Sequence, residues 1–134
     1  MRVILLFLTI FSLLLSCKDK PAIVKQLAGS DSLVITFNLP GTDSVIGTVS
    51  TTETNAIQKL AGFMDGKEQA KQSCGFDGNM IFFKGGQQAL PVVFKFSGDC
   101  RFFMYELEQK LIYTEVSKEG AAFLESLKEG KSWY

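Results

Sequence analysis

A two-residue alternation of inward and outward side chains constrains the fold of this chain more than any other feature. It is clearest over residues 32–39, where the apolar residues Leu33, Ile35, Phe37 and Leu39 alternate with residues of the opposite face. This period is typical of a strand with one buried face. The Pro-Gly-Thr-Asp run at residues 40–43 favours a turn, and residues 44–49 can return as a second strand. The start of the domain is therefore predicted to be a β-hairpin.

A helical period follows this hairpin. The sequence Ser-Thr-Thr-Glu at residues 50–53 has the form of a capping box, which predicts that a helix begins at Ser50. Apolar side chains then recur at helical spacing, and the Asp-Gly pair at residues 65–66 supplies a stop. The members of this stripe are Ile57, Leu60, Ala61 and Met64, with Phe63 at its margin. A further helical turn is expected over residues 67–72.

The second half of the chain returns to strands and ends in a helix. Strands are predicted over residues 79–84, 90–97, 101–107 and 110–116, with residues 85–88 as the loop between the first two. Ser117 can cap a final helix whose apolar positions are Ala121, Phe123, Leu124 and Leu127, and Gly130 marks its end. This order predicts an α+β fold, an antiparallel meander sheet of about six strands with two helices packed on one face. We expect one domain over residues 31–134.

Two cysteines give the fold an expected covalent link. If Lys84 pairs with Leu90 across the 85–88 loop, the same register carried outward places Cys74 opposite Cys100. Their spacing is not Cys-x-x-Cys and the chain has no histidine, so a redox or metal pair is disfavoured. A structural disulfide between Cys74 and Cys100 is the prediction.

The same predicted register makes the second face of this hairpin apolar as well. It places Ile81 opposite Val93 and Phe83 near Pro91. Two interpretations stay open for Ile81 and Phe83. Either a helix or a neighbouring sheet covers them as core, or they form an exposed patch for a partner.

The amino terminus has the pattern of an export signal. Arg2 precedes an apolar run over residues 3–15 that is interrupted only by Thr9 and Ser12. As a helix this run would extend only about 20 Å, short of the hydrocarbon core of a bilayer of roughly 30 Å. The run is therefore predicted to be a cleaved signal over residues 1–16 rather than a membrane span.

The sequence Leu14-Leu15-Ser16-Cys17 resembles the lipobox of bacterial lipoproteins. The resemblance implies that Cys17 receives a diacylglyceryl group, that the signal is cut before it, and that the new amine is acylated. The resemblance also has implications for sorting. Retention in the inner membrane uses an aspartate directly after the lipidated cysteine, and Lys18 at this position favours the outer membrane, with the domain facing the periplasm. The residues Lys18-Asp19 partly match a signal for export to the cell surface, so display there stays an alternative. Residues 17–30 are expected to be the lipidated cysteine and a flexible tether.

Composition excludes several classes of function. Lys plus Arg and Asp plus Glu both number 14, and no basic cluster suggests a nucleic-acid partner. Without histidine, a serine or cysteine nucleophile lacks its usual base. No cofactor, metal or small-molecule ligand is indicated. A distant option is a small envelope hydrolase using Glu106, Glu108 and Glu115, which are close in the last predicted hairpin.

The resulting expectation is a lipid-anchored protein of the cell envelope without catalytic activity. It would be a binding, interaction or inhibitor module with an envelope protein as its partner. The alternative is a structural or assembly accessory lipoprotein.

Overall fold

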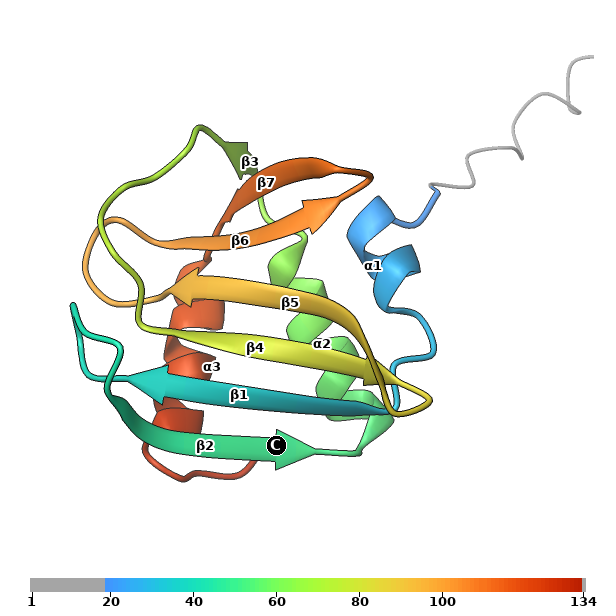
Figure 1. Ribbon diagram of the computed structural model, residues 1–134, viewed down its shortest axis with the longest axis horizontal. Coiled ribbons are helices and arrows are strands. Elements are labelled where there is room, and N and C mark those ends of the chain that lie inside the picture. Colours follow the sequence, from blue (N-terminus) through green and yellow to red (C-terminus); the bar gives the residue numbers. More distant parts are fainter. Residues whose placement is uncertain (1–18, 134) are drawn as a thin grey trace, which may run out of the picture.

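The computed structural model describes residues 19–133, which form one seven-stranded antiparallel sheet and three helices (Figure 1). The order across the sheet is β2-β1-β4-β5-β6-β7-β3. The strands are β1 (Ser32–Asn38), β2 (Val45–Thr51), β3 (Glu68–Gln69), β4 (Gly78–Lys84), β5 (Gln87–Lys95), β6 (Phe102–Leu107) and β7 (Lys110–Glu115). The α+β meander is therefore confirmed, with one more strand and one more helix than the sequence predicted.

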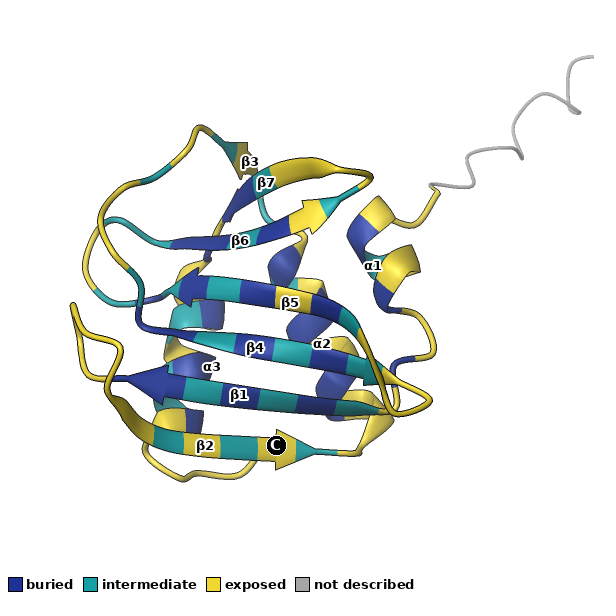
Figure 2. Cartoon of the chain, in the orientation of Figure 1, coloured by how far each residue is buried: buried dark blue, intermediate teal, exposed yellow. Residues whose placement is uncertain are grey.

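The core lies between the sheet and its helices. In β1 the side chains of Leu33, Ile35 and Phe37 are fully buried, while the residues between them are half-buried on the opposite face. The alternation continues into β4 and β5, so the buried positions form rows across the sheet (Figure 2). The two-residue period thus locates the core as predicted up to Phe37. The prediction was wrong for Leu39, which follows the end of β1 and is 50% exposed.

Helices α2 (Thr54–Met64) and α3 (Lys118–Lys128) lie on the same side of the sheet (Figure 1). The predicted stripe of α2 is buried, and its margin residue Phe63 packs against Phe123 of α3 at 5.5 Å between ring centres. In α3 the hydroxyl of Ser117 accepts a hydrogen bond from the backbone N–H of Gly120 at 3.0 Å. Gly130 follows the helix with φ +77°, so both predicted ends of α3 are confirmed.

The capping box at the start of α2 was a wrong prediction. Strand β2 continues through Thr51, and the N-cap is Glu53, which makes no side-chain cap. The Thr51 hydroxyl instead accepts the N–H of Glu53 at 3.1 Å. Pairing of β2 with β1 extends to Thr51 and takes the residues that the capping box would have used.

The helical turn predicted over residues 67–72 was also wrong. Residues 68–69 form β3 and pair with β7, where Glu68 faces Thr114 and Gln69 faces Tyr113. The N–H of Glu115 bonds to the carbonyl of Lys67 at 2.8 Å and extends this pairing. The segment has no apolar stripe that a helix could bury, so strand pairing at the sheet edge prevails.

Part of the expected tether is folded. Helix α1 (Ala22–Leu27) buries Ile23 and Leu27, which are four residues apart and therefore share one face of the helix. Both side chains join the core cluster, and α1 contacts α2. The packed domain thus begins at α1 rather than at Asp31, and Pro21, the N-cap, ends the polar stretch.

Candidate interaction surface

The sheet face opposite the helices carries a set of apolar side chains, which we call the open-face patch. One row crosses three strands, with Val34 of β1 facing Ile81 of β4 and Ile81 facing Pro91 of β5. Val34 and Ile81 are half-buried and Pro91 is exposed. The remaining members are Phe83, Val93 and Met104, all half-buried. Helices α2 and α3 lie on the other side of the sheet (Figure 1), and α1 packs Ile23 and Leu27 into the same core as these two helices.

The register within this face differs from the predicted one by two residues. Ile81 faces Pro91 rather than Val93, and Phe83 faces Gln88 rather than lying beside Pro91. The shift has two causes. The hairpin turns over only two residues, Gly85 and Gly86, which both have positive φ, and the pairing of β4 with β5 has a bulge at Phe82 and Phe83. A shift of two residues keeps every side chain on its face, so the prediction of an apolar second face holds.

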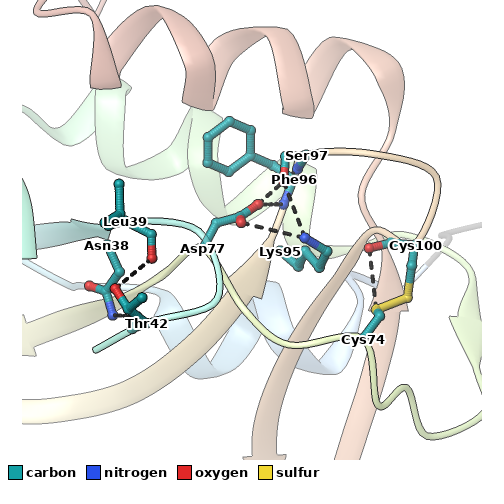
Figure 3. A network of polar contacts seen from close by, with 9 residues as sticks. All are labelled: Asn38, Leu39, Thr42, Cys74, Asp77, Lys95, Phe96, Ser97 and Cys100. Carbon is teal, nitrogen blue, oxygen red and sulfur yellow. Dashed lines mark hydrogen bonds and ion pairs between the residues drawn. A yellow bond between two sulfur atoms is a disulfide. The ribbon is translucent and has the colours of Figure 1, made fainter. Parts of the chain in front are cut away.

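The Cys74–Cys100 disulfide is confirmed, although the register from which it was predicted was wrong. The two Cα atoms are 6.5 Å apart, and the cysteines lie in loops beyond the paired strands. The bond links the segment between β3 and β4 to the loop between β5 and β6 (Figure 3). Cys74 is exposed and Cys100 half-buried, so the link lies at the surface.

This linked segment adjoins a small second cluster on the open face. Phe102 and Tyr113 are buried with ring centres 5.5 Å apart, and neither belongs to the main core cluster. Gln69 faces Tyr113 across the β3–β7 ladder, and its side-chain amide donates to the carbonyl of Arg101 at 3.0 Å. The open face therefore has a covered end at β6 and β7 and a bare part over β1, β4 and β5.

One buried carboxylate fixes the end of the β4–β5 hairpin (Figure 3). Asp77 is 4% exposed, and its Oδ2 accepts the backbone N–H groups of Phe96 at 3.0 Å and Ser97 at 2.8 Å. Its Oδ1 lies 3.5 Å from Lys95 Nζ. Burial by itself raises the pKa of Asp77, but the bonds from Ser97 and Phe96 and the charge of Lys95 outweigh burial and lower it. These partners give Asp77 a structural role.

A groove of about 520 Å³ lies between α1 and α2. It was not predicted, because residues 22–27 were expected to belong to a flexible tether. Its floor is apolar, with Leu27 and Ile57, and its rim includes Lys20, Asp31 and Gln58. The groove is continuous with the start of the described chain.

The three carboxylates proposed for a hydrolase do not all lie together. Glu106, Glu108 and Glu115 are all exposed. Glu106 faces Leu111 whereas Glu115 faces Phe102, four positions along the hairpin or roughly 13 Å away. Within residues 19–133 no group of three His, Cys, Asp or Glu side chains is arranged to hold a metal ion.

The predicted lipidation residue, Cys17, lies outside the described residues. No helix of residues 19–133 is long and apolar enough to cross a membrane. No protein-family model matches the sequence, and no curated protein or solved structure matches the chain.

Proposed function

We propose that the mature chain is a lipid-anchored protein of the bacterial cell envelope and a non-catalytic binding module. Its partner, an envelope protein, would bind the open-face patch. The observation that carries this proposal is the row Val34, Ile81 and Pro91, a continuous apolar line across three strands on a face that no described helix covers. Apolar side chains gathered on an accessible sheet face are typical of an interaction surface.

The short distance between anchor and domain supports this proposal. Only four residues separate Cys17 from Ala22, the first residue of α1. Four extended residues reach about 14 Å, so a lipid on Cys17 would hold the domain close to the bilayer surface. Three acyl chains on the amino-terminal cysteine would make this attachment durable, since even two lipid signals give stable anchoring. A partner in the same membrane would then meet the domain at high local concentration.

Metabolic labelling with a palmitate analogue tests the anchor. The wild-type chain should incorporate the label and sediment with outer-membrane fractions, whereas Cys17→Ala should lose the label because the acceptor thiol is gone. Cys74→Ala, which removes a different thiol, should keep the label. Label that persists in Cys17→Ala would refute lipidation at this residue.

Site-specific photocrosslinking in intact envelopes tests the surface. A photoreactive side chain at Ile81 should give a discrete adduct, and one at Glu119, exposed on α3, should not. The adduct from the Ile81 position should disappear when Phe83→Ser is added, because Phe83 belongs to the same patch. Equal adducts from both positions, or none from Ile81, would contradict the proposed surface.

A further inference from the structure

The groove between α1 and α2 has the form of a site for a narrow apolar ligand. Val24 and Leu27 line it from α1, and Ile57 and Ala61 line it from α2. The residues of each pair are three or four positions apart, so one face of each helix forms the lining. The volume of about 520 Å³ is within the range of small-ligand sites, whereas a protein partner needs a far larger surface.

One buried polar group of this lining has no partner. Ser30 follows α1, is only 8% exposed, and its Oγ makes no hydrogen bond to any other described residue. A buried hydroxyl without a partner is destabilising, and native proteins contain few of them. A carbonyl oxygen of a bound ligand can accept the Ser30 O–H. The ligand that suits this groove is therefore apolar and carries an acceptor oxygen.

The charges of the lining favour a ligand without net charge. Its two charged residues are Lys20 and Asp31, which have opposite signs. The carboxylate of Asp31 accepts the backbone N–H of Gly85 at 2.6 Å and the hydroxyl of Ser32 at 3.4 Å, so the fold holds this negative charge in place. It would repel the anionic head of a free fatty acid or a phospholipid. The amide and the esters of a lipidated cysteine are neutral.

The groove also lies within reach of the expected lipid. Lys20, in its lining, is three residues from Cys17, and three extended residues span about 10 Å. The α2 face of the groove, from Thr54 to Ala61, has a similar length of about 10 Å. A lipid attached to Cys17 can therefore reach all of the groove.

We propose that this groove binds one of the acyl chains of Cys17, and that Ser30 donates a hydrogen bond to an ester or amide carbonyl of the lipid. The inference rests on the proposed lipidation of Cys17. Attachment to the same chain gives this lipid a high effective concentration at the groove, which no free lipid has. The two other acyl chains remain in the bilayer and are enough for stable anchoring.

A photoreactive palmitate analogue, incorporated metabolically into the full lipoprotein, tests the groove in intact envelopes. Trypsin cuts after Lys25 and Lys59 and releases residues 26–59, which include Leu27, Ser30 and Ile57 of the lining. After illumination, the monomeric chain should yield this peptide joined to the amino-terminal lipopeptide, as identified by mass spectrometry. Residues 26–59 joined to a bilayer phospholipid and not to the lipopeptide would overturn the proposal.

Three variants sharpen this measurement. Gln58→Trp places a large ring in the groove from an exposed position of α2 and should remove most of the adduct. Asn55→Trp is the matched control, because Asn55 is equally exposed on α2 but does not line the groove. Ser30→Ala adds no bulk and should lower the adduct yield by about fivefold through the lost hydrogen bond. Equal yields from wild type and all three variants would overturn the proposal.

The label on the undigested chain separates the two ways in which the inference can fail. A wild-type chain without label would refute lipidation, and the inference with it. A labelled chain that gives no adduct on residues 26–59 would refute the groove alone and leave the anchor in place. Circular dichroism of the variants checks that the substitutions leave the fold intact, and Ser30→Ala still tests the groove if Gln58→Trp does not fold.

Discussion

The two faces of the sheet differ in what covers them, although both are built largely from apolar side chains. On the helix side Phe82, Met80 and Phe94 are completely buried under α1, α2 and α3 and form one core. On the open side their sequence neighbours Ile81 and Phe83 are only half-buried. Alternation along a strand decides which face a residue joins, but only the tertiary structure decides whether that face is core.

Phe82 and Phe83 provide the sharpest contrast between the faces. Phe82→Ala leaves a cavity in a fully packed core and should lower the free energy of unfolding by roughly 4 kcal/mol. Phe83→Ala removes a ring that already meets solvent and should cost about 1 kcal/mol. Denaturant melts of the two variants measure the difference. Similar losses would mean that the open face is packed in solution and would remove the basis for the interaction surface.

The disulfide tests the covered end of the open face. Replacing Cys74 and Cys100 together by serine removes a link across 26 residues, which should cost roughly 3.5 kcal/mol in the chain-entropy model. The melting temperature should then fall by about 10 °C or more. Hydrogen exchange should show faster exchange around Phe102 and Tyr113 than around Phe82 in the variant. Unchanged exchange at Phe102 would show that the linked segment does not protect this cluster.

Asp77 lies at the end of the β4–β5 hairpin and offers a pH-dependent test. Asp77→Asn weakens bonds to two backbone N–H groups and to Lys95, and should cost about 2 kcal/mol at pH 7. Because the pKa of Asp77 is lowered in the folded chain, its stabilisation is full above the ordinary value of 3.8 and is lost as pH falls through the folded pKa. The stability difference between wild type and variant should therefore shrink below about pH 4. A difference that stays constant to pH 2 would contradict the lowered pKa.

The sequence predicted those parts of the fold whose signals are local and periodic. The period of two located the strands, and the stripe at Ile57 and Met64 located α2 because one helix face must be buried. The Ser117 cap succeeded because its hydroxyl needs only an amide three residues away. Such features are set within a few residues of the chain.

The errors arose where distant pairing overrides local preference. Ser50 has good capping chemistry, but its backbone pairs with β1 and remains in a strand. Residues 68–69 are ordered by β7, more than forty positions away in sequence. Helix α1 is too short for a clear periodic signal, and it is ordered by the packing of Ile23 and Leu27 into the core. The open face was predicted to be apolar, but its exposure depends on where the helices pack.

The turn between β6 and β7 offers a smaller change that touches neither face. Glu108 and Gln109 both adopt positive φ, at 51° and 64°, a conformation that favours asparagine and glycine. Glu108→Asn combined with Gln109→Gly should therefore stabilise the domain by about 1 kcal/mol, measured by a denaturant melt. Both positions are exposed, so the open-face patch is unaltered. The photocrosslink from Ile81 should keep its intensity in this variant. A change in its intensity would mean that the crosslink reports opening of the fold rather than a surface of the native domain. The open face would then no longer be supported as a binding surface.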